Sequence, residues 1–562
     1  MSYDEATAAL TAPGERFEIG EEVIRGIPTK VWKSAPGSLR EILELSRGHG
    51  DAPFLVYEDE RWTFERHYRA AAALAHALVD RFGVQPGDRV AIAMRNFPEW
   101  AVSFWAAAAA GAVVVPLNAW WTAEELEYGL ADSGSVVLFC DEERAGRMAP
   151  HVAGLGLRNV VVAKAEGALP GGMLRVEDVI DGQPEPAGDG LPAVEIAPED
   201  DATIFYTSGT TGRPKGAVGT HRNILTNLVS LGFVSACNAV RFGADESRDH
   251  KKRQPASLLS VPLFHATGCH SILLSSTAAG AKLVMMYKWD PERALELIER
   301  EEITSFGGVP AMVMQVLESP DLAKRDTSSI SSVGYGGAPA PPELVRRIRD
   351  AFGDVISPSN GYGLTETSSV STMNRGPDYV RKPDSVGRPV PVVSVKVVDD
   401  AGREVAEGGV GELWIRGPNV VRGYWNKPEA TAEAFTDGWL HTGDIARIDD
   451  EGYVYIVDRA KDMVIRGGEN VYCVEVETVL YDHPAVVDAA VFGIPHPVLG
   501  EEVAAVVQVK RGASVTEQEL RDHVAAHLAG FKVPVRVEVR DEPLPRNPQG
   551  KILKRQLRDE VT

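Results

Sequence analysis

Residues 67–162 alternate between helical and strand patterns, and this alternation constrains the fold more than any other feature of the chain. Helical patterns cover 67–82 and 99–110, and apolar strand patterns cover 89–94, 113–115, 136–139 and 160–162. Strands that alternate with helices form βαβ units, whose strands pair in parallel. We therefore predict an α/β fold built on a largely parallel sheet.

The longest apolar stretch covers residues 101–117 and is interrupted by Ser103, Gly111 and Pro116. It is shorter than the roughly 20 residues that a bilayer span needs. It predicts a buried helix, a stop at Gly111 and a strand over 112–115. The acidic, polar first 17 residues do not resemble a secretory signal. We therefore expect a cytoplasmic protein without an integral membrane segment.

Length, charge and cysteine content limit the classes of function that the chain can have. The chain has 562 residues, enough for several domains, and a net charge of −22 from 58 Lys+Arg and 80 Asp+Glu. This charge argues against non-specific nucleic-acid binding but allows a locally positive pocket for small anions. The four cysteines form no C-x-x-C pair, so nothing predicts a metal cluster or a redox dithiol.

The tail has its own pattern. Residues 467–558 contain strand patterns at 489–492, 503–509 and 535–539 and a helix pattern at 517–528. This indicates a small α+β domain of about 100 residues. We place its boundary near residues 458–462, and we expect residues 167–195 and 245–253 to be surface loops.

Tyr206–Gly216 (YTSGTTGRPKG) combines three glycines, four Ser/Thr hydroxyls and one lysine. Glycines let the backbone approach a ligand closely, and exposed N–H groups, hydroxyls and Lys215 suit phosphate oxygens. The Walker A pattern G-x-x-x-x-G-K-[ST] is absent, because Arg213-Pro214-Lys215-Gly216 follows Gly212 and the next helix starts only near residues 220–223. A kinase or ATPase of the P-loop class is therefore disfavoured.

This string resembles the signature of the adenylate-forming superfamily, which includes acyl-CoA synthetases, non-ribosomal peptide adenylation domains and beetle luciferases. Further segments resemble the family's motifs in the family's order: 262–265 (PLFH), 335–339 (YGGAP), 360–367 (NGYGLTET), 442–444 (TGD), 458–477 (DRAKDMVIRGGENVYCVEVE) and 545–555 (PRNPQGKILKR). The resemblance runs from about residue 40 to the end of the chain.

The resemblance implies an α/β, multidomain fold. A large N-terminal domain (1–457) would combine stacked α/β layers with a β-barrel-like part. A hinge (458–461) would join it to a small mobile C-terminal α+β domain (462–562) that carries the catalytic lysine. It also implies an acid–thiol ligase that uses ATP and Mg²⁺ to join a carboxylic acid to AMP, and then passes the acyl group to coenzyme A.

Three catalytic roles follow from the resemblance. Lys551 would bridge the carboxylate and the α-phosphate, although a solvated tail lysine and the neighbouring Lys554 are the local alternatives. Glu366 would hold Mg²⁺, which prefers oxygen ligands. His265 would lie between the nucleotide and acyl sites and gate thiol entry, without acting as an obligatory general base.

The resemblance also implies a nucleotide site. Asp444 would accept hydrogen bonds from the ribose hydroxyls, and Arg459 would be a second ribose or phosphate contact. Tyr362 would stack on adenine, with a core role as the alternative. The remaining ATP/AMP-binding candidates are Thr207, Ser208, Gly209, Thr210, Thr211, Gly212, Lys215, Gly336, Gly337, Ala338, Asn360, Gly361, Gly363 and Thr365.

The family's two half-reactions imply a domain rotation. Lys461 occupies the hinge position, and Gly467, Gly468 and Glu469 form the loop expected to replace Lys551 on the coenzyme A side. The chain ends at Thr562 without a carrier domain, so coenzyme A is the expected acceptor. A free-standing fatty acyl-AMP ligase that loads a carrier protein is the alternative.

The predicted acyl pocket consists of apolar and small residues: Phe264, His265, Gly268, Val309 and Gly334. Because no acidic residue stands in the segments 261–275, 306–313 and 332–338 to hold an amine, we expect a medium- to long-chain fatty acid, with an aromatic or alicyclic acid second. The expected partners are these small molecules, and the sequence is compatible with a homodimer. A nucleotide-binding regulator without turnover is the rival class, but it would be expected to lack Lys551 or Glu366.

Overall fold

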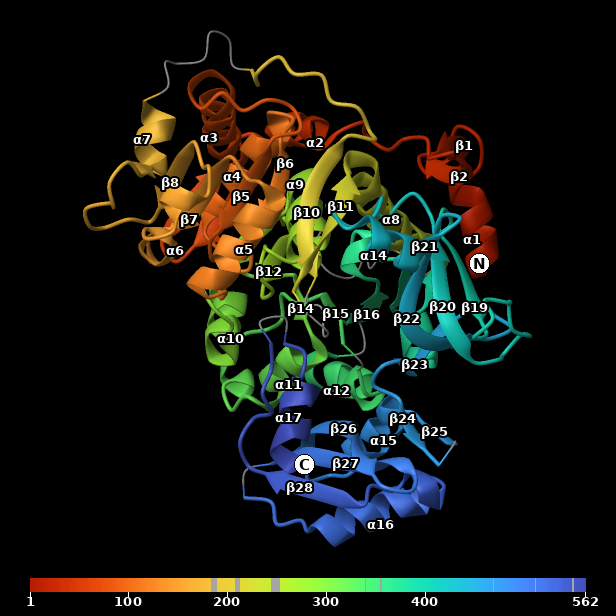
Figure 1. Ribbon diagram of the computed structural model, residues 1–562. Coiled ribbons are helices and arrows are strands. Elements are labelled where there is room, and N and C mark those ends of the chain that lie inside the picture. Colours follow the sequence, from red (N-terminus) through yellow and green to blue (C-terminus); the bar gives the residue numbers. More distant parts are fainter. Residues whose placement is uncertain are drawn as a thin grey trace.

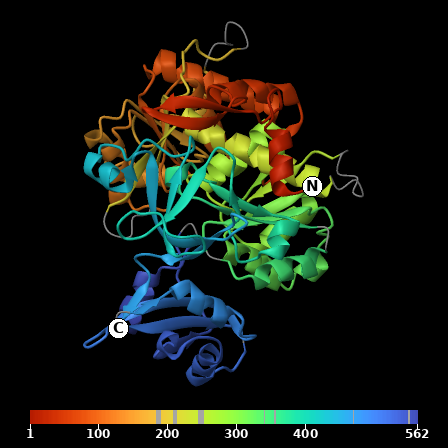
Figure 2. The same ribbon diagram turned by 90° about the vertical axis from the view of Figure 1, so that its right-hand side faces the viewer.

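The computed structural model describes the chain except for residues 183–189, 208–212, 244–252, 339, 354–355, 468, 511 and 548–549. The chain forms a large N-terminal lobe and a smaller C-terminal lobe, drawn in blue at the bottom of Figures 1 and 2. Three large sheets and the β1–β2 hairpin (Ile19–Ile24, Ile27–Trp32) form the large lobe, and a further five-stranded sheet forms the small lobe. This mixed α/β, two-domain arrangement confirms the predicted fold class.

The first large sheet is the predicted parallel sheet, with the strand order β11-β10-β6-β5-β7-β8-β9. All its neighbouring pairs are parallel except β10–β11, which forms an antiparallel hairpin. Its strands are β5 (Arg89–Ala93), β6 (Val113–Pro116), β7 (Val137–Asp141), β8 (Asn159–Ala163), β9 (Leu174–Arg175), β10 (Asp201–Thr207) and β11 (Lys215–Thr220).

The apolar stretch 101–117 forms a buried helix and a strand, as predicted. Helix α4 (Pro98–Ala109) is buried along its whole length, and Gly111, with φ +72°, starts the turn into β6. Helices α2 (Leu39–Ser46) and α3 (Phe64–His76) pack against α4. Trp100 and Trp105 of α4 are fully buried in the core that these helices share.

The second sheet has nine strands in the order β18-β17-β16-β15-β14-β12-β13-β3-β4 and is parallel from β3 to β16. Its strands are β3 (Pro53–Tyr57), β4 (Glu60–Thr63), β12 (Ala256–Leu259), β13 (Lys282–Met285), β14 (Ser305–Gly308), β15 (Ser332–Gly336), β16 (Ser357–Tyr362), β17 (Thr372–Arg375) and β18 (Arg388–Pro389). Helices α10 (Pro291–Arg300), α11 (Pro310–Glu318) and α12 (Glu343–Phe352) follow β13, β14 and β15 along the chain. Because β14 to β16 run in parallel, the segments after them open at one edge of the sheet.

The third sheet is antiparallel and brings the chain to the small lobe. Its strands are β19 (Ser394–Val398), β20 (Gly411–Arg416), β21 (Phe435–Thr436), β22 (Trp439–Ile448) and β23 (Val454–Arg459). Strand β23 pairs with β22, so Asp444 lies opposite Arg459 and Ile445 lies opposite Asp458. The small lobe begins directly after β23 (Figure 1).

The small lobe has a core of its own. Its strands are β24 (Val464–Arg466), β25 (Glu469–Val471), β26 (Val486–His496), β27 (Gly500–Val509) and β28 (Arg536–Arg540), and its helices are α15 (Cys473–Tyr481), α16 (Glu517–His527) and α17 (Lys554–Val561). Buried valines and alanines of β24 to β28 pack against buried side chains of α15 and α16, among them Leu480 and Leu520. The strand patterns predicted at 489–492, 503–509 and 535–539 and the helix at 517–528 fall on β26, β27, β28 and α16. Helices α15 and α17 were not predicted.

The segment 167–195, which we expected to be a loop, contains β9 and helix α7 (Val176–Asp181), whose Val176 and Val179 are buried. Helix α8 (His221–Phe242) is long and apolar enough to cross a membrane by length and composition alone, although 44% of its apolar 18-residue stretch is buried inside the protein. It packs against α1 (Tyr3–Leu10) and β2, as a core helix does. The absence of a membrane segment and the cytoplasmic location stay predictions.

Candidate active site

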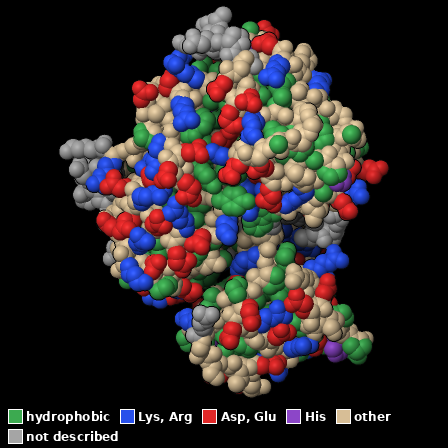
Figure 3. Space-filling model, turned by 90° about the vertical axis from the view of Figure 1, so that its left-hand side faces the viewer, with side chains coloured by type: hydrophobic (Ala, Val, Ile, Leu, Met, Phe, Trp, Pro, Cys, Tyr) green, Lys and Arg blue, Asp and Glu red, His purple; other side chains and the backbone are tan. Residues whose placement is uncertain are grey.

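A cavity of about 1840 Å³ lies between the two lobes, and Figure 3 shows the molecule hollowed at this junction. Both lobes contribute residues from the predicted site. The large lobe contributes Val309, Gly337, Ala338, Asn360, Gly361, Tyr362, Gly363, Asp444 and Arg459, the small lobe contributes Lys551, and Lys461 lines the cavity at the junction. The structure therefore brings together motifs that lie more than 200 residues apart in the chain.

Lys551 stands on the loop between β28 and α17 and reaches into this cavity. Asn547 shapes the loop: its side-chain oxygen accepts the Lys551 N–H at 2.9 Å, and its N–H donates to the Lys551 carbonyl at 2.8 Å. Gly550 has φ +78°, and a β-carbon there would lie 2.5 Å from Cγ2 of Val309. Only glycine allows the loop to approach the predicted acyl pocket this closely.

The surroundings of Lys551 change its acidity. Burial and the nearby Arg459 lower the pKa of Lys551 to about 8, while the carboxylates of Asp444 and Glu366 oppose the shift. Lys554, three residues further on, points elsewhere: its ammonium pairs with Glu477 at 2.6 Å inside the small lobe, and this carboxylate raises the pKa of Lys554. The structure thus separates the two lysines that the sequence could not distinguish.

Asp444 is held by two donors at the wall of the cavity. Arg459 Nε lies 2.9 Å from its Oδ1, and the hydroxyl of Tyr362 donates to its Oδ2 at 2.6 Å. The register of β22 and β23 sets Arg459 opposite Asp444. A carboxylate oxygen can accept more than one hydrogen bond, so the predicted ribose hydroxyls still find acceptors here. The link between Tyr362 and Asp444 was not predicted, and adenine stacking by Tyr362 stays a prediction.

Glu366 lies in a single helical turn, Thr365–Thr367, after β16. The hydroxyl of Tyr424 donates to its Oε1 at 2.8 Å, and the ammonium of Lys215 lies 5.2 Å from the Tyr424 ring centroid. Tyr424 therefore connects the predicted metal ligand to the lysine of the phosphate loop. One partly exposed carboxylate suits Mg²⁺, which usually takes its other ligands from phosphates and water.

The phosphate loop is described only at its ends. Thr207 closes β10, where its hydroxyl donates to the carbonyl of Lys215 at 3.3 Å across the β10–β11 hairpin. Ser208, Gly209, Thr210, Thr211 and Gly212 lie outside the described residues, as does Gly468 of the coenzyme A loop. Their predicted roles stay predictions.

The NGYG segment requires its last glycine. A β-carbon at Gly363 would lie 1.5 Å from the carbonyl oxygen of Ser369, so no other residue fits there without moving the chain. Gly361 pairs with Gly336 across β15 and β16, and Gly337 and Ala338 follow β15 directly. The glycine segments thus meet beside the cavity. The close approach of this backbone to adenine stays a prediction.

His265 lies beside Phe264, with ring centroids 4.6 Å apart in an edge-to-face arrangement. Burial and the charge of Lys551 lower the pKa of His265 to about 3, which keeps its ring neutral at physiological pH. Of the other predicted acyl-pocket residues, Gly268 follows on the next helical turn and Gly334 lies on β15. Of the predicted acyl-pocket residues, only Val309 is among the described residues that line the cleft with Lys551. Phe264 lines a separate small cavity with Met286 and Met312.

Lys461 lies in the turn after β23 and lines the cavity, and burial and Arg459 lower its pKa. Gly467 and Glu469 belong to the β24–β25 turn and are not among the cavity-lining residues that the structure describes. The lysine loop therefore occupies the cleft, while the described part of the thiol-side loop does not line it. This is the arrangement expected for the first half-reaction.

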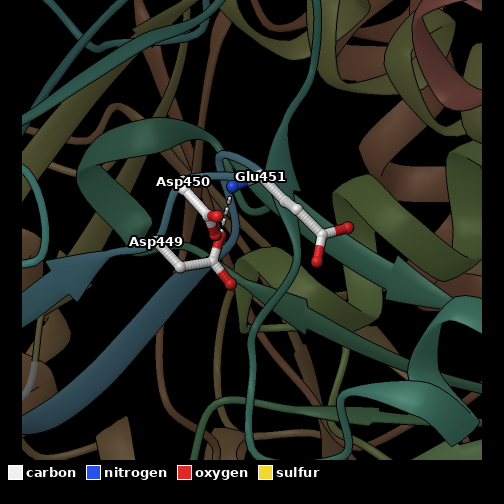
Figure 4. Close-up of side chains that lie close together, drawn as sticks. All are labelled: Asp449, Asp450 and Glu451. Atoms are coloured by element: carbon white, nitrogen blue, oxygen red, sulfur yellow. Dashed lines mark hydrogen bonds between the residues drawn. The ribbon is translucent and has the colours of Figure 1, made fainter.

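Asp449, Asp450 and Glu451 form the one cluster of three acidic side chains close enough to hold a metal within the described ranges (Figure 4). Asp449 accepts the N–H groups of Glu451 at 3.1 Å and Tyr453 at 2.8 Å and so shapes the turn between β22 and β23. Lys382 pairs with Asp449 and with Glu451. The cluster is thus explained by turn geometry and ion pairs.

Comparison with known proteins identifies the family. The AMP-binding enzyme family matches residues 44–425, and its C-terminal domain matches residues 475–551. A feruloyl-CoA synthase from an Amycolatopsis species is 38% identical over 497 residues, covering 88% of this chain and 93% of its own. The long-chain-fatty-acid–CoA ligase FadD13 of Mycobacterium tuberculosis is 36% identical over 507 residues, covering 90% and 94%.

A solved structure gives the same picture. The anthranilate CoA ligase AuaEII, in complex with anthranoyl-AMP, superposes with a TM-score of 0.83 at 28% identity, covering 93% of this chain and 97% of its own. The family matches cover most of the chain, and the two lobes enclose predicted residues from both. The chain belongs to the AMP-binding enzyme family and is an AMP-forming acid–thiol ligase that uses ATP and coenzyme A.

Proposed function

We propose that this ligase activates a medium- to long-chain fatty acid as its acyl-adenylate and transfers the acyl group to coenzyme A. The observation that carries the proposal is Val309, which lies against Gly550 of the Lys551 loop and lines the cleft together with Pro310, Ala311 and Met314. No acidic residue stands in the segments 261–275, 306–313 and 332–338. A buried methylene contributes about 0.8 kcal/mol, so an apolar surface rewards a longer chain.

In the first half-reaction, a carboxylate oxygen of the acid attacks the α-phosphorus of ATP, and the bond to the β-phosphate oxygen breaks. Lys551 would lie between the two anions and stabilise the negative charge that develops there. Asp444 would orient the ribose. Glu366 would hold Mg²⁺, which when bound neutralises charge on the phosphates.

In the second half-reaction, the thiol sulfur of coenzyme A attacks the acyl carbon, the proton of the thiol is lost to solvent, and AMP leaves. We propose that the chain turns at Lys461 between the two steps, so that Lys551 leaves the cleft and the Gly467–Glu469 segment enters it. The neutral ring of His265 would then border the path of the thiol without carrying a charge. The predicted boundaries (1–457, 458–461 and 462–562) belong to this proposal.

An aromatic acid is the second candidate, because the 38% identical feruloyl-CoA synthase and the anthranilate CoA ligase act on aromatic acids by their names. A panel of acetate, octanoate, palmitate, benzoate and ferulate, scored by pyrophosphate release with and without coenzyme A, separates the candidates. We expect octanoate or palmitate to give the highest kcat/KM and coenzyme A to increase turnover. A maximum at ferulate would favour the second candidate, and a maximum at acetate would contradict both.

The acidity of Lys551 predicts a pH dependence. The ammonium is the form that stabilises the developing charge, and its pKa in the free enzyme is about 8. The kcat/KM for adenylation should therefore be constant below this pH and fall as the pH rises above it. Pyrophosphate–ATP exchange across the neutral and alkaline range measures the profile. A profile that stays flat into the alkaline range, or one that the residual activity of Lys551→Ala shares, would contradict the role of this ammonium.

A further inference from the structure

The start of helix α15 in the small lobe has no side-chain cap of its own. Its N-cap residue, Tyr472, makes no capping hydrogen bond. The N–H of Cys473, the first residue of the helix, instead donates to Oδ2 of Asp458. Asp458 is 1% exposed, so this contact is made away from water.

Asp458 is the first residue of the predicted hinge (458–461), but it lies on the sheet of the large lobe rather than in the lobe whose helix it caps. It is part of β23 and lies opposite Ile445 of β22. Its Oδ1 accepts the N–H of Arg459 at 2.7 Å, which fixes the orientation of the carboxylate. If the chain turns at Lys461, Asp458 remains with the sheet, while Cys473 moves with α15.

A second charge of the small lobe acts on the same carboxylate. Burial raises the pKa of Asp458 to about 6, and the ammonium of Lys554 opposes this shift. Lys554 begins α17, directly after the loop that carries Lys551, and its pairing with Glu477 at 2.6 Å attaches α17 to α15. Glu477 also accepts the N–H of Val491 at 2.8 Å, so α15, β26 and α17 are held as one unit.

We infer that Asp458 is a positioning residue for the first half-reaction: by capping α15 across the hinge, it holds the small lobe in the orientation that places Lys551 in the cleft. A carboxylate at a helix N-terminus is favoured by its hydrogen bond and by the helix dipole. If the small lobe turns at Lys461, Cys473 and Lys554 move relative to Asp458, so the cap and the attraction of the ammonium both favour the present orientation. This inference rests on the proposed rotation of the small lobe.

The test compares the two half-reactions in Asp458→Ala and Asp458→Asn. Loss of the cap lowers the population of the adenylation orientation, so pyrophosphate–ATP exchange should fall about fivefold to tenfold in Asp458→Ala and less in Asp458→Asn. Transfer from supplied acyl-AMP to coenzyme A should stay within about twofold of wild type or rise. Asp449→Ala is the matched control. Asp449 is an ion-paired carboxylate in the turn between β22 and β23, and its partners all lie in the large lobe. Its removal should leave the ratio of the two rates unchanged.

Hydrogen exchange at the amide of Cys473, monitored by mass spectrometry, measures whether the Cys473–Asp458 hydrogen bond is present in the folded protein. We expect faster exchange in Asp458→Ala and an unchanged rate in Asp449→Ala. Equal losses in both half-reactions, or unchanged exchange at Cys473, would overturn the inference. Absence of pyrophosphate exchange in the wild type would refute the proposed function instead, and the Cys473 amide would still report whether Asp458 holds α15.

Discussion

Replacing Lys551 by alanine is expected to abolish most acyl-AMP formation while leaving the transfer step intact. Removing one donor that faces developing charge typically costs about 3–4 kcal/mol, so the rate of adenylation should fall about 100- to 1000-fold. Transfer of the acyl group from supplied acyl-AMP to coenzyme A should be spared, because the lysine would have left the cleft by then. Pyrophosphate–ATP exchange measures the first step, and thioester formation from acyl-AMP measures the second.

Lys510→Ala is the matched control for this prediction. Lys510 is an exposed lysine of the same lobe, at the end of β27, and its removal should change neither rate. Equal loss of both half-reactions in Lys551→Ala would show that the lysine acts through the fold of the small lobe rather than on the reacting phosphate.

Replacing Lys461 by proline should produce the opposite selectivity. Proline fixes φ near −65° and so removes the freedom that a hinge needs to turn. If the lobe stays in the present orientation, pyrophosphate release keeps its rate within a few-fold, while thioester formation should fall by at least about tenfold. Single-turnover measurements of the two steps with the same acid give the comparison.

Lys461→Ala distinguishes the effect of a fixed backbone angle from the effect of losing the lysine side chain. Alanine removes the ammonium but keeps a free φ, so its thioester rate should remain close to that of wild type. Normal thioester formation by Lys461→Pro would argue against rotation at this residue. A loss shared by the alanine variant would assign the effect to the lysine charge in the cleft.

The hydrophobic pattern of the sequence predicted the fold correctly where consecutive residues of a strand or helix are all buried. The strands β5 to β8 are buried runs separated by helical periods, so their boundaries could be predicted to within a few residues. The stretch 101–117 was interpreted correctly because Gly111 separates a fully buried helix from a fully buried strand. By contrast, α7 lies in a segment rich in Gly, Pro and Asp, and only its two buried valines distinguish it from a loop.

Site residues that belong to a recognisable sequence motif could be predicted. Residues that reach the site only through contacts in the folded chain were missed. Lys551, Asp444 and Arg459 could be named from the sequence, and the structure brings them to one cavity. Tyr424 holds Glu366 from 58 residues away, and no local pattern marks it. Lys554 and Lys551 look alike in sequence, because only the folded lobe shows that one is paired with Glu477 and the other faces the cleft.

The proposed mechanism depends on a buried ammonium from the small lobe that allows two anions to join at phosphorus. The most direct test is the exchange of labelled pyrophosphate into ATP in the presence of octanoate or palmitate, for the wild type and Lys551→Ala side by side. We predict acid-dependent exchange by the wild type and its near-complete loss in the variant. No exchange by folded wild-type protein with any carboxylic acid of the panel, or equal exchange by the variant, would contradict this mechanism.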